Sequence, residues 1–460
     1  MSEHRVAFTI LTNEGFRQFE GGVARYVHNI LDAREQAEAV ARRHGVSVEW
    51  HVAERGARTG TDAASLQRAL DRYVHNGSVQ YHSLLDPRHG SDTDHFEHSV
   101  ATGAQAGQLT LALARDADSV LVIGGMTMFA MAPRFVVRAA EQYGVRATFV
   151  HMTHEPVRRP KNDAGLPYAY ADTVAGHLAR VDDRVCVGWE SGWMREQYQQ
   201  VYGLPDEKLL FARAGVPLDD PKFAPQKPDE IEAALRNAGV PLDRDLVVSW
   251  GRGDAYKGFD LFLDAAKADG DRLVPVVLNP RPNPGLAEHA RRIGSPAVLL
   301  SGMSDRFVSA VCQWPRTVTA AFLSNAEAAA VAPVEAALMG GRRGLIVTTV
   351  PTGVYPELNR HLETGVVAAD RTVAGVAEAL RAAHGLSPAR RVEMGTAAWE
   401  NARKNHDFKV NWLRSFEEML TRHLAVVGGL PGPDPGITAR PASASVPRTR
   451  EQAEDERLRT

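Results

Sequence analysis

The stretch TVTAAFLSNAEAAAVAPVEAALMGG, residues 317–341, contains a strand, a turn and a helix in succession. Its first seven residues are β-branched or apolar, as in a buried strand, and the alanine-rich part that follows favours a helix. Two glutamates, Glu327 and Glu335, stand on either side of the expected helix start. The first N–H groups of a helix have no partner within it and attract anions. We therefore predict a ligand site at this point.

The two glutamates have no basic residue between them, and Val331 occupies the position four residues after Glu327 where a helical ion-pair partner would stand. We therefore expect both carboxylates to bind hydroxyl groups of a ligand rather than basic side chains of the protein. The same pattern is also typical of two surface acids near a favourable helix dipole, and that alternative stays open at this point.

Length and composition limit the class of protein. The chain has 460 residues, enough for two or three domains, and a formal net charge of -3, which argues against nucleic-acid or anionic-membrane binding. Its two cysteines, Cys186 and Cys312, have no zinc-site spacing. No apolar run approaches the roughly 20 residues of a membrane span. The first residues show no signal-peptide pattern, so we expect a cytoplasmic protein.

Strand-like and helix-like segments alternate along the chain, which predicts parallel sheets covered by helices on both faces. The expected strands of the first half are residues 5–13, 47–54, 78–85, 119–125, 147–154, 184–189 and 208–215. Those of the second half are residues 246–252, 273–279, 297–302, 317–324 and 345–350. The fold class is therefore α/β, with two tandem Rossmann-like doubly wound domains whose strand ends face each other across a cleft.

Two segments interrupt this alternation. Residues 217–230 carry four prolines and many charges and are interpreted as the joint between the domains. Residues 428–460 are rich in Pro, Gly, Ser and charge without apolar periodicity, which predicts a disordered tail.

Two further patterns are typical of phosphate binding. Gly21 and Gly22 follow the first strand and open the first helix, although an ordinary turn has the same sequence. Arg252 stands just past a strand and Lys257 at the start of a helix, and a loop with Arg and Lys at this spacing can hold a diphosphate from two sides. In the alternative interpretation both are solvated loop charges.

Several segments together resemble family 4 glycosyltransferases, retaining enzymes of the GT-B fold whose hallmark is an E-x7-E motif. Those of the second half are GRGDAYKGFD (251–260), SNAEAAAVAPVEAALMGG (324–341), TTVPTGVYPEL (348–358) and ETGVV (363–367). Those of the first half are FEGGVARYVHNI (19–30), THEP (153–156), VDDRVCVGWES (181–191) and ARAGVPLDD (212–220). Glu327 and Glu335 match the E-x7-E spacing, and the resemblance covers roughly residues 5–425.

The resemblance implies an acceptor domain at residues 1–216 and a nucleotide-sugar donor domain at 217–408, with a helix at about 409–425 packing back on the first. It also implies the site. Catalytic roles fall to His154, Arg252, Lys257 and Glu327. Donor binding falls to Gly21, Gly22, Arg252, Lys257, Met303, Glu327, Val331, Ala332 and Glu335. Within this set Glu335 would bind the ribose, Glu327 the hexose, and the segment at Met303 the base.

The function implied is transfer of a sugar from a nucleotide-diphosphate sugar to a small polar acceptor, with retention of configuration. No cofactor, metal, nucleic acid or stable membrane association is expected, and a homodimer is compatible with the sequence. The composition is typical of high-GC bacteria, where such enzymes often build specialised metabolites such as antibiotics. Two alternatives stay open: a nucleotide-sugar epimerase of the same fold, and a catalytically silent nucleotide-binding subunit.

Two features fit this interpretation less well. Asp92-Thr93-Asp94 matches the D-x-D metal signature of a different glycosyltransferase fold, but a three-residue match in a polar loop arises often by chance. The segment GGRRG (340–344) is about three residues longer than the turn usual in the family. Its role does not follow from the sequence.

Overall fold

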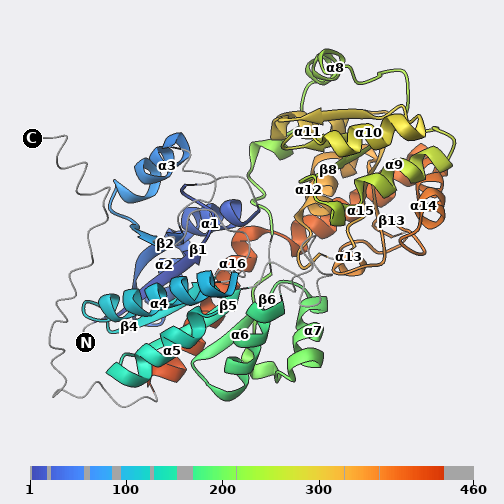
Figure 1. Ribbon diagram of the computed structural model, residues 1–460. Helices are drawn as coiled ribbons and strands as arrows, with labels where there is room; N and C mark the ends of the chain where they lie inside the picture. The colour runs from blue at the N-terminus through green and yellow to red at the C-terminus, as the bar shows by residue number, and fades with distance from the viewer. Residues whose placement is uncertain are drawn as a thin grey trace, which may run out of the picture.

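The computed structural model contains two α/β domains that the chain connects by two crossings (Figure 1). It describes residues 3–17, 22–55, 63–84, 95–124, 129–152, 169–213, 215–325, 327–361 and 363–428.

The first domain is built on a seven-stranded parallel sheet in the order β3-β2-β1-β4-β5-β6-β7. Its strands are β1 (His4–Thr12), β2 (Val46–Arg55), β3 (Gln80–Leu84), β4 (Ser119–Gly124), β5 (Ala147–Met152), β6 (Val185–Trp189) and β7 (Leu209–Phe211). Strand β1 lies between β2 and β4 and sets the register with both, because Phe8 lies opposite Trp50 on one side and Leu121 on the other. Side chains of β1 are buried alternately on the two faces, as a doubly covered sheet requires.

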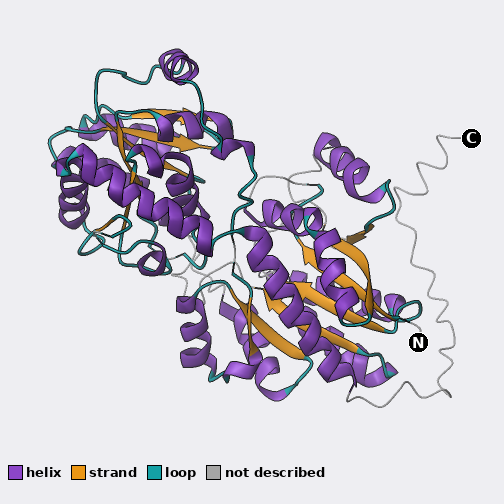
Figure 2. Cartoon of the chain, turned by 180° about the vertical axis from the view of Figure 1, so that it is seen from behind, coloured by secondary structure: helices purple, strands orange, loops and turns teal. Residues whose placement is uncertain are grey.

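Helices cover both faces of this sheet (Figure 2). They are α1 (Gly22–Asp32), α2 (Arg34–Arg43), α3 (Ala63–Ala69), α4 (His95–Leu113), α5 (Ala132–Tyr143), α6 (Ala169–Val181), α7 (Gly192–Tyr202) and α16 (Phe408–Gly428), with the single turns η1 (Leu70–Val74) and η3 (Asp206–Lys208). Phe8 and Ile10 pack towards α1, α2 and α16, whereas Ala7 and Leu11 pack towards α4, α5, α6 and α7.

The second domain repeats the plan with a six-stranded parallel sheet, ordered β10-β9-β8-β11-β12-β13. Its strands are β8 (Leu246–Trp250), β9 (Val274–Asn279), β10 (Val298–Ser301), β11 (Thr317–Phe322), β12 (Ile346–Thr349) and β13 (Val366–Val367). Its helices are α8 (Pro228–Asn237), α9 (Phe259–Ala268), α10 (Pro284–Ile293), α11 (Asp305–Gln313), α12 (Val331–Gly340), α13 (Tyr355–Leu358), α14 (Val373–Gly385) and α15 (Pro388–Asn405), with the turns η4 (Pro221–Phe223), η5 (Ala255–Lys257) and η6 (Gly341–Arg343).

The predicted pair of doubly wound domains is thus confirmed. Within the described ranges, no helix of either domain combines the length and apolar composition needed to cross a membrane.

The last described helix belongs to the first domain, although it follows the second in sequence (Figure 1). On α16, Phe416 has its ring 5.5 Å from that of Phe8 and stacks on Trp50 at 5.9 Å. Trp412 and Leu420, both almost fully buried, extend this contact along the helix. The helix therefore completes the first hydrophobic core.

The two chain crossings between the domains lie side by side. The N–H of Val216 donates to the carbonyl of His406 at 2.9 Å, and the N–H of Phe408 donates to the carbonyl of Val216 at 3.0 Å. A Cβ at Gly215 would lie 2.6 Å from the His406 oxygen, so only glycine allows this approach. The strand expected at residues 208–215 is accordingly too long: β7 ends at Phe211, because the chain from Gly215 pairs with the other crossing.

The segment GGRRG forms the turn η6 after α12. The guanidinium of Arg343 donates to the carbonyls of Gln313 at 3.2 Å and Gln226 at 3.4 Å. The guanidinium of Arg342 lies 5.0 Å from the ring centre of Trp399. The extra residues therefore connect α12 with the interdomain linker, the end of α11 and α15.

Candidate active site

Helix α12 begins where the chain leaves β11 at the carboxyl edge of the second sheet. Its N-cap residue, Ala330, has no side chain that could bond the first N–H groups, and no described side chain caps them. Pro333 has no N–H, so those of Val331 and Ala332 are the donors at this helix start. Together with the helix dipole they make the N-terminus of α12 attractive to an anion.

The turn that carries Glu327 is fixed by the loop after β12. The N–H of Val354 donates to the carbonyl of Glu327 at 3.1 Å, and the Thr352 hydroxyl donates to the carbonyl of Ser324 at 2.8 Å. Gly353 has φ +57°, and a Cβ there would lie 2.6 Å from the Glu327 carbonyl oxygen. This close approach requires glycine, and it holds the Glu327 side chain at the sheet edge.

Glu327 has a basic partner. The Nζ of Lys257 lies 2.5 Å from Glu327 Oε1, and the two side chains are 22% and 14% exposed. Burial acts to lower the pKa of Lys257, but Glu327 and Tyr256 together outweigh it and the pKa is raised. The expectation that Glu327 lacks a basic partner is therefore wrong, because the partner comes from a loop 70 positions away in the sequence.

Arg252 lies on the same loop at the carboxyl end of β8. Its Nε is 3.1 Å from Asp254 Oδ2, and 57% of its side chain is exposed. Burial acts to lower the pKa of Arg252, but Asp254 and Tyr256 outweigh it, with a contribution from Glu14 of the first domain. The backbone of the loop is joined to the Glu327 turn, because the N–H of Asn325 donates to the carbonyl of Tyr256 at 3.0 Å.

Glu335 lies one turn into α12 and is buried, with 6% of its surface exposed. Its Oε1 accepts from Lys222 Nζ at 2.6 Å and from Arg25 Nη1 at 3.1 Å. The expectation of no basic partner is wrong here too. Lys222 comes from the interdomain linker and Arg25 from α1 of the first domain, so neither pair follows a helical spacing.

The remaining predicted site residues are described only in part. Gly22 is the first residue of α1. Met303 is half-buried in the turn between β10 and α11 and packs against the second core. Gly21 and His154 fall outside the described residues, as do Asp92 and Asp94 and the tail from residue 429.

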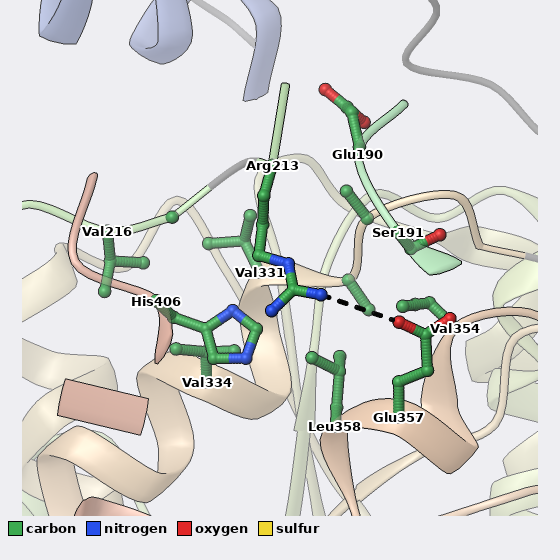
Figure 3. A pocket seen from close by; sticks show the side chains of 13 residues that line it. Glu190, Ser191, Arg213, Val216, Val331, Val334, Val354, Glu357, Leu358 and His406 are labelled. Carbon is green, nitrogen blue, oxygen red and sulfur yellow. Dashed lines mark ion pairs between the residues drawn. The ribbon is translucent and has the colours of Figure 1, made fainter. Parts of the chain in front are cut away.

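A pocket that opens to solvent, with about 420 Å³ of space not filled by protein atoms, extends from the start of α12 towards the two crossings (Figure 3). Both domains line it. Its polar lining residues are Glu190, Ser191, Arg213, Glu357 and His406. None of them was named as a site residue from the sequence, although four of them lie in the segments that carry the family resemblance. Ala330 and Val331 form the wall on the side of α12. The pocket therefore borders the helix start at which the anion site is predicted.

Glu357 joins the domains across this pocket. Its carboxylate accepts the N–H groups of Gly192, at 2.9 Å, and of Trp193, both in the first turn of α7. The guanidinium of Arg213 lies 3.9 Å from the same carboxylate (Figure 3). Burial and the neighbouring Arg213 charge lower the pKa of His406 to about 4, so the imidazole is neutral at pH 7. The segment YPEL contains Glu357, but nothing in its spacing indicates a partner in the other domain.

Comparisons with solved structures show which known folds this architecture is similar to. A glycosyltransferase from Rickettsia africae superposes with a TM-score of 0.66 at 13% identity, covering 93% of this chain and 99% of that one. Anabaena HepE, in complex with UDP and glucose, gives a TM-score of 0.61 at 14% identity, covering 91% and 99%. Sucrose-phosphate synthase from Thermosynechococcus elongatus gives 0.63 at 14% identity, covering 92% and 99%.

The chain has the GT-B fold. No protein-family model matches the sequence. No curated protein matches it. In this GT-B chain, Lys257, Arg252, Glu327 and the start of α12 all lie at the carboxyl edge of the second sheet, the edge at which doubly wound sheets bind ligands.

Proposed function

We propose that this protein is a retaining glycosyltransferase of the family 4 type, which transfers a sugar from a nucleotide-diphosphate sugar to a small polar acceptor. The supporting observation is that the cations Arg252 and Lys257 and the Glu327 carboxylate lie with the N-terminus of α12 at one sheet edge. The Glu335 carboxylate follows one turn into that helix. Cations and N–H groups suit a diphosphate, and carboxylates suit hydroxyl groups. The structures of HepE contain UDP and UDP-glucose, so UDP-glucose is the first donor to test.

In this proposal the ion pair of Lys257 with Glu327 keeps both side chains in the cleft before the donor arrives. The diphosphate would then take Lys257 as its partner, and hexose hydroxyls would donate to Glu327. Each group exchanges one polar partner for another, so neither is left buried without a partner. The carboxylate of Glu335, held at Oε1, would receive the ribose hydroxyls.

The reaction breaks the bond between the anomeric carbon and the leaving phosphate oxygen. The acceptor hydroxyl forms the new bond on the same face of the sugar, and its proton passes to the departing phosphate oxygen. Arg252, Lys257 and the N–H groups of Val331 and Ala332 would stabilise the negative charge that grows on the diphosphate. His154 would hydrogen-bond the reacting sugar from the first domain. Cationic side chains supply the neutralisation, so the proposal needs no metal or cofactor.

A panel of nucleotide sugars tests the proposal directly. The full chain is incubated with UDP-, GDP-, ADP- and dTDP-sugars, with and without small-molecule extracts as acceptors. We expect release of nucleoside diphosphate and a glycosylated product with retained anomeric configuration by NMR. Failure of every donor to bind would overturn the proposal.

The same panel separates the two alternatives. Formation of an isomeric nucleotide sugar without any acceptor would indicate an epimerase. Binding without turnover, in the presence of acceptor extracts, would indicate a silent subunit. A product with inverted anomeric configuration would support a glycosyltransferase but would contradict the assignment to the retaining, family 4 type.

A further inference from the structure

Arg25 contacts the buried donor-side glutamate from the opposite domain. It lies in the first turn of α1, on the first domain, and donates to Glu335 Oε1 at 3.1 Å. Its Nη2 is 3.1 Å from Oδ2 of Asp305, at the start of α11 in the second domain. One arginine thus binds two acids of the facing domain.

Lys222, the second cation on this carboxylate, belongs with the second domain. It lies in η4 of the linker with 5% of its surface exposed, and its carbonyl accepts from the Ser309 hydroxyl of α11 at 2.6 Å. Its Nζ is also 3.5 Å from Asp220 Oδ2. Lys222 therefore stays with Glu335 whatever the position of the first domain.

Lys222 and Arg25 differ in whether their contact with Glu335 depends on the position of the first domain. Lys222 neutralises Glu335 at all times, whereas Arg25 reaches it only while α1 and α12 are as close as they are here. Both bind Oε1, and no described residue bonds to Oε2. With Oε1 held from two directions, the carboxylate plane is fixed and Oε2 is left to accept from a ligand.

We infer that Arg25 is a positioning residue that couples donor recognition to closure of the two domains. This rests on the proposed function, in which Glu335 binds the ribose. Closure brings Arg25 onto Oε1 and fixes Oε2 for the ribose hydroxyls. The bound ribose in turn favours the closed arrangement in which Arg25 makes its contacts, because binding and closure are linked reciprocally.

Titration calorimetry with UDP tests the binding half of this inference. Arg25→Met should weaken UDP about tenfold, the loss of one charge-assisted contact, and Arg25→Lys should recover part of it. The matched control is Arg42→Met on α2, whose partner Glu38 is four residues away on the same helix, and it should bind UDP as the wild type does.

A distance measurement tests the closure half. Val181 and Val392 are exposed, one in each domain, and the two native cysteines are buried, so spin labels on V181C and V392C report the interdomain distance. UDP should shift this distance in the wild type. In Arg25→Met the distribution of this distance should be broader without UDP. Addition of UDP should also shift it less than in the wild type.

The outcomes are distinct. UDP binding that is unchanged or tighter in Arg25→Met would overturn the inference, because Arg25 would then only occupy the carboxylate until a donor displaces it. A lower melting temperature with unchanged binding and distances would show a structural role and also overturn it. If the wild type binds no nucleoside diphosphate at all, the proposed function falls first and the coupling falls with it.

Discussion

Glu327 and Glu335 stand eight positions apart, yet the protein surrounds them differently. Glu327 lies in a turn, 14% exposed, with one cation from a neighbouring loop of the same domain. Glu335 is buried in a helix, and its cations come from the linker and from the other domain. The partner of Glu327 can move aside for a ligand, whereas the partners of Glu335 hold that carboxylate in place. Similar residues in one short motif thus have an exchangeable environment and a fixed one.

The exchangeable pair should carry the largest functional effect. Replacing Lys257 with alanine should reduce turnover by roughly 10²–10³-fold, about 3–4 kcal/mol, because its contact to the leaving group strengthens as charge grows. Steady-state kinetics on the donor identified by the panel measures this. Lys267→Ala, on the exposed face of α9 with Asp271 as partner, is the control and should be near normal. Near-normal turnover in Lys257→Ala would contradict the proposed contact of Lys257 with the diphosphate.

The fixed environment should show in stability. Glu335→Gln should lower the free energy of unfolding by about 3 kcal/mol, because it leaves the buried ammonium of Lys222 without its nearest opposite charge. Glu327→Gln should cost less, since the side chain of Lys257, 22% exposed, can turn to water. Urea unfolding of the two variants compares them under one condition. Equal losses would contradict the difference drawn between the two environments.

Ligand binding sharpens the same comparison. Glu335→Gln should weaken free nucleoside diphosphate and intact donor alike, by about 1.5–3 kcal/mol, because both contain the ribose. Glu327→Gln should leave nucleoside diphosphate binding nearly intact and lower turnover of the intact donor. Calorimetry with both ligands and both variants decides between them. If Glu327→Gln weakens the bare nucleotide as much as the donor, the division between hexose and ribose is wrong.

Acid should destabilise the fold through three buried histidines. Burial lowers the pKa of His423 to about 3, burial with His82 nearby lowers that of His51 to about 4, and burial with Arg213 nearby lowers that of His406 to about 4. Each is neutral when folded, so its stabilisation is complete above about pH 6.5 and is lost as the pH falls towards 4. At pH 5 a single such histidine costs about 2 kcal/mol. Urea unfolding between pH 7.5 and 5 should show this fall, and His406→Gln should make it shallower.

Metal removal should leave turnover unchanged, which makes it the smallest of the expected effects. Arg252, Lys257 and the start of α12 supply the positive charge that a metal would otherwise bring to the diphosphate. Turnover should therefore survive exhaustive treatment with EDTA. A loss that Mg²⁺ or Mn²⁺ restores would return attention to Asp92 and Asp94.

The sequence predicted the fold class because parallel strands buried on both faces form apolar runs that alternate with amphipathic helices. It erred where tertiary contacts limit an element, as at β7, and it gave no sign of β13, which is only two residues long and has no period. For the site, the sequence predicted which residues lie at the sheet edge, but it did not predict their ion-pair partners within the protein. Arg25 and Glu335 are 310 positions apart, and no spacing rule connects such residues.

The return of α16 to the first domain also has a consequence for synthesis of the chain. Trp412 and Phe416 fill a core whose first strand begins at His4, so the first domain lacks an essential part until the ribosome has passed residue 420. The second domain is made from one uninterrupted stretch and can mature earlier. At 5–20 residues per second, the nascent first domain waits roughly 10–40 s with an open apolar surface. Because α16 is synthesised last, the first domain is the one that needs chaperones to protect it from aggregation during translation.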